Sequence, residues 1–192
     1  GAKVDVSTEP EPRNRVSLDI EIDEGEVAEI KNINIVGNLT FEDEEILKGF
    51  ELKTGGWFSF FTNDNRYSRE KLKGDIESLE SYYKNRGFVE FKLDSSQVSV
   101  TPDKTSVFIT LNIDEGSTYK VNDVKIVGDL PVDEELLNSL VLIKSGEIFN
   151  QYLITETEEI FKNILGNEGY SFAEIRGVPD VNKETGDVDL TF

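Results

Sequence analysis

Hydrophobic and polar residues alternate strictly in two stretches of the chain. Every second residue is apolar in 16–22 and again in 107–113. Alternation over this length is typical of a β-strand with one face buried and the other in water. Each stretch ends in Asp-Glu-Gly, and a second short apolar strand ending in Val-Gly follows, at 36–37 and at 127–128. The pattern therefore predicts the same joint between folded units at two places.

The two joints lie 91 residues apart, counted from Ile20 to Leu111, and recurrence at a fixed offset indicates tandem repeats. A chain of 192 residues has room for two small domains and a remnant. We expect the C-terminal hairpin of a preceding unit in 1–24, a complete unit in 25–115, and a following unit, truncated at its last strand, in 116–192. The predicted joint residues are Glu24, Gly25, Glu26, Glu115, Gly116 and Ser117.

The complete unit is predicted to begin with a strand over 29–36 and two helices. Thr40 is expected to cap the first helix and Ser68 the second, because hydroxyl side chains accept hydrogen bonds from free backbone N–H groups. The longer second helix has an apolar stripe at helical spacing, formed by Leu72, Ile76, Leu79 and Tyr83. Its charged positions are expected in water: Lys71, Lys73, Asp75, Glu77, Glu80 and Lys84.

Gly87 is expected to end this helix in a left-handed conformation. Two strands then complete the unit, at about 89–100 and 106–113. The first of them lacks a clean alternation between Asp94 and Ser96, which indicates a β-bulge, a feature common on edge strands.

The second unit is expected to repeat this order, with its last strands near 173–179 and 188–192. The predicted fold class is α+β, with tandem units of order β-α-α-β-β. In each unit two helices pack on one face of a three-stranded mixed sheet.

An aromatic run at 55–61 is the most apolar short stretch of the chain and has no counterpart in the second unit. Two interpretations remain open, a loop that extends the core and an exposed surface that contacts a partner. The candidate contact residues are Trp57, Phe58, Phe60 and Phe61.

Composition argues against several classes of function. A net charge of −19 opposes binding to nucleic acid, and the absence of histidine and cysteine removes the usual general base and metal ligands. The acidic pairs at 23–24 and 114–115 lie on strands, where adjacent side chains point to opposite faces, so joint acid–base chemistry is not expected. We expect no enzymatic activity, no cofactor and no metal site.

Binding at a sheet edge is the remaining hypothesis. The outer strand of a three-stranded sheet presents unpaired N–H and C=O groups, and such an edge accepts an extended peptide by strand addition. The candidate partner-binding residues of this edge strand are Lys92, Leu93, Asp94, Ser95, Ser96, Gln97, Val98 and Val100.

The repeated plan resembles polypeptide-transport-associated (POTRA) domains. The resemblance is carried by Glu-Gly before each first strand, by Ile-Val-Gly-Asn at 35–38, and by Gly87-Phe88 and Gly169-Tyr170 after the long helices. Residues 71–79, with Tyr82-Tyr83 and 101–104, are similar to the third POTRA domain of the BamA family. On this resemblance, the chain contains the last strands of a second POTRA domain, all of the third and most of the fourth.

The resemblance implies a periplasmic array that precedes a barrel in the Gram-negative outer membrane. It also implies two kinds of partner: accessory lipoproteins of the barrel-assembly complex and unfolded outer-membrane protein precursors, contacted in part through 94–100. Membrane contact would come only from a barrel outside this chain. Two alternatives stay open: a two-partner secretion or TamA-like transporter, and a structural spacer that binds nothing by its edges.

Overall fold

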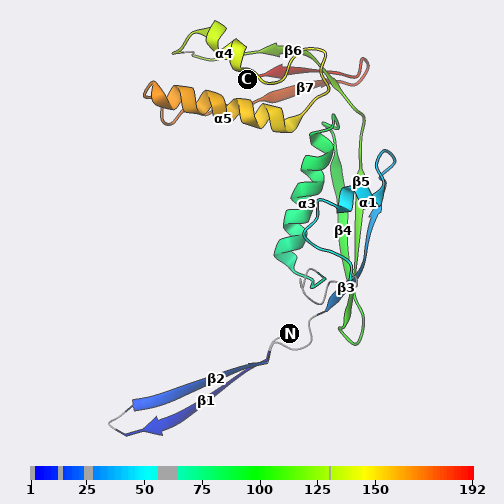
Figure 1. Cartoon of the computed structure of the whole chain (residues 1–192), viewed down its shortest axis with the longest axis vertical. Coiled ribbons are helices and arrows are strands. Elements are labelled where there is room, and N and C mark those ends of the chain that lie inside the picture. The colour runs from blue at the N-terminus through cyan, green and yellow to red at the C-terminus, as the bar shows by residue number, and fades with distance from the viewer. Residues whose placement is uncertain (1–2, 13–14, 24–27, 56–64, 130) are drawn as a thin grey trace.

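The computed structural model describes residues 3–12, 15–23, 28–55, 65–129 and 131–192 (Figure 1). The joint residues Glu24, Gly25 and Glu26 and the aromatic residues Trp57, Phe58, Phe60 and Phe61 lie outside these ranges. The first described element is an antiparallel hairpin of β1 (Lys3–Glu11) and β2 (Arg15–Asp23). Two larger units follow it along the chain.

The first unit has the predicted order of one strand, two helices and two strands. Its elements are β3 (Glu29–Val36), α1 (Asp43–Leu47), α3 (Arg69–Lys84), β4 (Lys92–Val100) and β5 (Ser106–Asp114). The sheet order is β3-β5-β4, with β5 parallel to β3 and antiparallel to β4. The sheet is therefore mixed, and β4 lies at its edge.

The second unit repeats this arrangement. Its elements are β6 (Lys120–Lys125), α4 (Glu134–Leu140), α5 (Gln151–Asn167), β7 (Val178–Asn182) and β8 (Asp187–Thr191). The sheet order β6-β8-β7, with β6 parallel to β8, places β6 where β3 lies in the first unit. The predicted tandem α+β fold is confirmed.

β5 supplies the centre of the first core. Its alternating residues Val107, Ile109, Leu111 and Ile113 are buried, as the sequence pattern predicts. From α3, Leu72, Leu79 and Tyr83 are buried in the same cluster, and Ile76 is partly buried. The second core is built alike, around Val188 and Leu190 of β8 and Ile154 and Phe161 of α5. Each unit thus buries an apolar cluster of its own, which is the main source of its stability.

Both ends of α3 are formed as predicted. Ser68 accepts a hydrogen bond from the Lys71 backbone N–H (3.3 Å), and Gly87 has a φ of 101°. The Phe88 N–H donates to the Tyr83 carbonyl (3.3 Å), which folds Phe88 back onto the helix. These features depend on neighbouring residues, and for that reason the sequence shows them.

Two predictions about polar residues of this unit were wrong. The N-cap of α1 is Glu42 rather than Thr40, and its side chain makes no capping bond. Asp75, expected in water, is only 1% exposed and accepts from the backbone N–H groups of Glu51 (2.5 Å) and Leu52 (3.0 Å). The segment after α1 folds over α3 and replaces water with these donors. Burial raises the pKa of Asp75, against the opposing effect of the two hydrogen bonds.

The strand expected near 173–179 also lies elsewhere, at β7 (Val178–Asn182). Backbone groups in 170–177 instead bond within the segment or to α5. The Ala173 N–H donates to the Tyr170 carbonyl (3.1 Å), and the Gly177 N–H donates to Glu158 Oε1 on α5 (2.6 Å). Because these backbone groups bond locally and to the helix, pairing with β8 begins only at Val178.

Candidate peptide-binding edge and inter-unit joint

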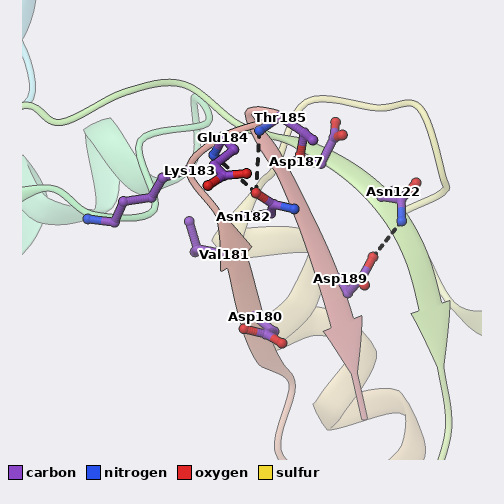
Figure 2. A pocket seen from close by; sticks show the side chains of 9 residues that line it. All are labelled: Asn122, Asp180, Val181, Asn182, Lys183, Glu184, Thr185, Asp187 and Asp189. Carbon is purple, nitrogen blue, oxygen red and sulfur yellow. Dashed lines mark hydrogen bonds between the residues drawn. The ribbon is translucent and has the colours of Figure 1, made fainter.

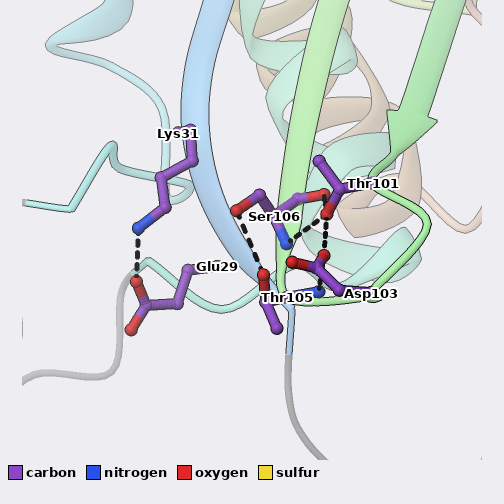
Figure 3. A network of polar contacts seen from close by, with 6 residues as sticks. All are labelled: Glu29, Lys31, Thr101, Asp103, Thr105 and Ser106. Carbon is purple, nitrogen blue, oxygen red and sulfur yellow. Dashed lines mark hydrogen bonds and ion pairs between the residues drawn. The ribbon is translucent and has the colours of Figure 1, made fainter.

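The turn between β4 and β5 fixes the register of the edge strand (Figure 3). The Thr101 N–H donates to the Ser106 carbonyl (3.0 Å), and the Ser106 N–H donates to Thr101 Oγ1 (3.1 Å). Asp103 accepts from the Thr101 hydroxyl (2.5 Å) and the Thr105 N–H (3.1 Å), and Lys104 takes a positive φ of 60°. Thr101 and Ser106 are therefore a hydrogen-bonded pair at the closed end of the hairpin.

This closing pair determines which β4 groups face outward. Hydrogen-bonded and non-hydrogen-bonded pairs alternate along an antiparallel ladder, and the register runs without a break from Val100↔Val107 to Ser95↔Asn112. Ser99, Gln97 and Ser95 therefore bond to β5. The residues that alternate with them direct their N–H and C=O groups away from β5: Ser96, Val98 and Val100.

The predicted β-bulge is confirmed, and it changes the role of one candidate residue. The register shifts between Leu93 and Ser95, which makes Asp94 the extra residue. Leu93 packs against the first core, whereas Ser95 lies on the opposite face and accepts from Asn112 Nδ2 (2.8 Å). The side chain of Leu93 therefore belongs to the domain core, and it is removed from the set of side chains that a partner can contact.

The remaining β4 side chains are accessible. Lys92, Asp94, Ser96 and Gln97 are exposed, Val98 is 36% exposed and Val100 is 51% exposed. The two valines lie opposite Ile109 and Val107, which are buried under the helices, so they sit at the outer margin of the same face. A strand added to β4 would meet apolar side chains on this face and polar ones on the other.

The corresponding edge of the second unit is different. β7 has five residues and contains Pro179. The Phe192 N–H donates to the Lys125 carbonyl on β6 (2.8 Å), so Asp187, Asp189 and Thr191 are the β8 residues that bond to β7. Pro179 consequently occupies an outward position, where the missing N–H costs no ladder bond. Short length and an outward proline both disfavour strand addition.

The edges formed by β3 and β6 are partly occupied by their own units. Ile30 on β3 donates to the Asn65 carbonyl (2.7 Å) and accepts from the Gly55 N–H (3.2 Å). Val121 on β6 donates to the Glu147 carbonyl (2.8 Å) and accepts from the Gly146 N–H (2.7 Å). Among the edge strands of the two three-stranded sheets, β4 therefore has the longest edge that no other described segment covers.

An open hollow of about 600 Å³ lies over the exposed face of the second sheet (Figure 2). Its lining includes Asp180, Asp187 and Asp189, and Asn122 Nδ2 donates to Asp189 Oδ1 (2.7 Å). Within the described ranges, no group of three or more His, Cys, Asp or Glu residues is arranged to hold a metal ion. The hollow is a charged sheet surface, and we assign it no chemistry.

Glu115, predicted as a joint residue, is a buried anchor of the first unit. It is 6% exposed and accepts from the Leu39 N–H (2.9 Å), the Thr40 N–H (3.1 Å), the Thr40 hydroxyl (2.8 Å) and the Tyr83 hydroxyl (2.8 Å). Burial acts to raise the pKa of Glu115, but the hydrogen bonds together outweigh it and hold the pKa below its ordinary value. Thr40, which the sequence predicts as a helix cap, therefore donates to Glu115 instead.

The first unit meets the second through the segment that follows α3, residues 85–91, which we call the α3-end segment. The Gly87 carbonyl accepts from the Tyr119 N–H (3.0 Å), and Val89 packs against the second core. Asn85 Oδ1 accepts from the Tyr152 N–H (2.9 Å) at the first turn of α5, while Gly116 and Ser117 are exposed. Contacts from the α3-end segment, rather than the linker residues themselves, hold this joint.

Glu90 makes two further polar contacts across the joint. Its Oε2 accepts from the Tyr119 hydroxyl (2.8 Å), and its Oε1 pairs with Lys183 Nζ (2.7 Å). The hydrogen bonds from Lys183 and Tyr119 lower the pKa of Glu90. These contacts could not be predicted from the sequence, because Tyr119 lies 29 residues from Glu90 and Lys183 lies farther away.

The repeated β-α-α-β-β units define a class of tandem domains, and comparison with known proteins identifies it. The chain belongs to the POTRA family: the family described as "Surface antigen variable number repeat" matches residues 28–116 and 119–192. The predicted resemblance is confirmed.

Particular relatives are outer-membrane protein assembly factors. Over 93% of the length of this chain, it is 32% identical to BamA of Neisseria meningitidis and 28% identical to BamA of Buchnera aphidicola. It spans only 22% and 29% of those two proteins. The crystal structure of Haemophilus influenzae BamA POTRA3-5 matches 86% of this chain and 65% of its own length, with a TM-score of 0.74 and 23% identity, and so shares the fold. No helix in the described part of the chain is long and apolar enough to cross a membrane.

Proposed function

We propose that the chain is the periplasmic POTRA region of a BamA-type assembly factor and that it binds unfolded outer-membrane protein precursors by strand addition to β4. In this proposal it also scaffolds the accessory lipoproteins of the assembly complex. Residues 1–24 end the second POTRA domain, 25–115 form the third, and 116–192 belong to the fourth. The relatives named above support the assembly role.

The observation that carries the binding proposal is the contrast between β4 and β7. β4 has nine residues, no proline and outward N–H groups at Ser96, Val98 and Val100, whereas β7 is short and has Pro179 at an outward position. Natural proteins commonly protect free edges with short strands and prolines. An unprotected edge of this length beside a protected equivalent supports a role in pairing with another chain.

Binding at this edge would depend mainly on main-chain hydrogen bonds, so precursors of many different sequences could bind there. Main-chain hydrogen bonds contribute roughly 1 kcal/mol each, and few outward groups are available, so binding is weak and reversible. Val98 and Val100 on one face and Gln97 and Ser99 on the other match the alternation of a barrel strand. Such an edge can hold an unfolded precursor transiently and release it.

The deciding experiment titrates the isotope-labelled chain with an extended peptide of alternating apolar and polar residues taken from an outer-membrane barrel strand. We expect amide shifts along 92–100, and at least a severalfold weaker affinity for Val98→Pro, which removes an outward N–H. Val98→Ala is the matched control, because it keeps that N–H and should bind nearly as the parent does. Full-affinity binding by a folded Val98→Pro variant would exclude the β4 edge.

The alternative binding surface is the aromatic run Trp57, Phe58, Phe60 and Phe61. If it were the main contact, Trp57→Ala or Phe60→Ala would abolish binding while Val98→Pro would not. A structural spacer would show no shifts in either region at peptide concentrations that saturate a POTRA array of known binding activity. The same labelled samples therefore separate all three outcomes.

A further inference from the structure

The helix layers of the two units correspond residue by residue. Buried residues in and after α1 recur 91 positions later, counted from Ile46 to Leu137, and those of α3 recur 82 positions later, counted from Leu72 to Ile154. The other buried pairs are Phe50 and Val141, Leu52 and Ile143, and Leu79 and Phe161. The two layers can therefore be compared position by position.

Six positions at the surface of this layer differ in polarity between the units. In chain order, the first unit carries Glu45, Gly49, Glu51, Lys71, Ser78 and Tyr82. The second unit carries six apolar residues at the equivalent positions, which we call the α4–α5 strip: Leu136, Leu140, Leu142, Leu153, Ile160 and Ile164. Leu136 is 48% exposed and Leu142 is 42% exposed, and the other four are partly buried.

The α4–α5 strip runs over two helices that lie side by side (Figure 1). Leu153, Ile160 and Ile164 share one side of α5, because spacings of seven and four residues return to the same helical face. Leu140, Leu153 and Ile160 pack against the second core, and the Leu142 N–H bonds to a side chain of α5. The apolar residues therefore form one surface.

The first unit closes the equivalent surface with its own polar side chains. The Tyr82 hydroxyl donates to Glu45 Oε1 (2.5 Å), and the Arg86 guanidinium lies 3.7 Å from the centre of the Tyr82 ring. Tyr82 and Glu45 correspond to Ile164 and Leu136, whose side chains cannot form such a bond. The second unit thus leaves apolar area in water where the first unit has an internal hydrogen bond.

We propose that the α4–α5 strip is the docking site for an amphipathic helix of a partner protein, with lysine or arginine beside the apolar stripe of that helix. Adjoining exposed apolar side chains mark interaction surfaces. Because the surface is made of helices, it has no strand edge, and a partner must dock by its side chains. From Leu153 to Ile164 the strip extends ~16 Å along α5, so about three turns of a partner helix cover it.

The charge around the strip favours a basic partner. The charged residues of α4 and α5 are Glu134, Glu135, Glu156, Glu158, Glu159 and Lys162. Five of these six are acidic, and Glu156 lies between Leu153 and Ile160 along α5. The net charge of −19 opposes a second copy of the chain and an anionic membrane at the same surface. Basic side chains that flank an apolar stripe complement both properties of the strip.

The test titrates the 192-residue chain into a fluorescently labelled, stapled helical peptide of about three turns. The peptide carries leucine along one face and lysine beside it. A control peptide of the same composition has its leucines distributed around the helix. We expect the first peptide to bind at least about tenfold more tightly by fluorescence anisotropy, because only it can place its leucines together on the strip.

Leu136→Glu and Leu142→Glu, made together, test the strip itself. They introduce the residues that the first unit carries at Glu45 and Glu51, so the double variant should keep the melting temperature of the parent. Peptide affinity should fall by about tenfold or more. The added carboxylates would strengthen a purely electrostatic attraction, so a lost affinity reports the apolar contact.

Leu39→Glu is the matched control, because Leu39 is a 93% exposed leucine of the first unit. It should leave peptide affinity within about twofold of the parent. Val98→Pro on β4 should also leave it unchanged, so this inference and the proposed function can fail separately.

Three kinds of result would overturn the proposal. The first is equal binding of the two peptides, or undiminished binding by the folded double variant. The second is a dimer of the parent chain in sedimentation that the double variant lacks, because the occupant would then be a second copy. The third is binding to vesicles of anionic phospholipid that the double variant loses, because the occupant would then be a membrane surface.

Discussion

The hydroxyl of Tyr83 donates to the carboxylate of Glu115 across 2.8 Å, and this bond joins the end of α3 to the end of β5. The same carboxylate accepts two backbone N–H groups and a hydroxyl from Leu39 and Thr40. One buried side chain thus ties together three segments that are far apart in sequence. Glu115 also directly precedes the joint residues Gly116 and Ser117. The same side chain therefore stabilises the first unit and fixes the start of the joint.

Removing this anchor should destabilise the first unit. Glu115→Ala leaves the Tyr83 hydroxyl and two N–H groups without their acceptor, and we expect a loss of about 3 kcal/mol in the free energy of unfolding. Chemical denaturation followed by tyrosine fluorescence measures it. Glu77→Ala, an exposed change on α3, is the control and should stay within about 0.5 kcal/mol of the parent. Equal stability of the two variants would show that Glu115 is not an anchor.

The contribution of Glu115 should depend on pH in a defined direction. Its folded-state pKa is lowered from the ordinary 4.5, so its stabilising effect is fully present above that pH and declines as pH falls through the lowered value. Glu115→Gln does not titrate, so the stability gap between parent and variant should narrow as the pH falls from neutral through 4.5 and below. Denaturation midpoints measured across this range test the direction. A gap that widens on acidification contradicts the assignment.

Gly37 and Gly74 should respond in opposite ways to alanine. A Cβ on Gly37 would clash with the Ile113 carbonyl oxygen, and the φ of 101° at Gly37 is unfavourable for alanine, so Gly37→Ala should cost more than about 2 kcal/mol. Gly74 lies within α3 with nothing near the added atom, and Gly74→Ala should stabilise by up to about 1 kcal/mol. Thermal melts of the pair check both signs. A neutral Gly37→Ala would mean that β3 and β5 are not packed this closely.

The joint between the units should loosen when Glu90 is removed. Glu90→Ala deletes the acceptor of the Tyr119 hydroxyl and the partner of Lys183, and we expect a broader distribution of distances between the units with little change in melting temperature. The chain contains no cysteine, so one introduced on each unit can carry a pair of spin labels without interference.

Lys183→Ala is the comparison for the joint, because the lysine is largely exposed and such surface pairs contribute little. It should broaden the distance distribution less than Glu90→Ala does. Raising the salt concentration should mimic Lys183→Ala only. If Glu90→Ala leaves the distribution unchanged, the backbone contact at Gly87 and the packing of Val89 are sufficient to hold the joint.

The sequence by itself determined the features that depend on residues close together in the chain. Alternation placed β5 in the core, the 91-residue offset established the repeat, and Ser68, Gly87 and the irregular pattern at Asp94 located a cap, a helix end and a bulge. Each of these rests on local backbone geometry or on one face of one element. These local patterns therefore predict the same features whatever tertiary contacts the rest of the chain makes.

Only the tertiary structure decided where polar groups find partners across the fold. The sequence predicts Asp75 on the surface, but the backbone 23 and 24 positions earlier folds over it and donates to its carboxylate. The sequence predicts Thr40 as a helix cap, but Thr40 binds Glu115, 75 positions later. The outward direction of the Val98 N–H depends on the pairing that the Thr101–Ser106 turn sets, and a shift of one residue would reverse it. A hydrogen bond between distant residues leaves no periodic trace in a sequence, because any nearby donor can satisfy the same acceptor.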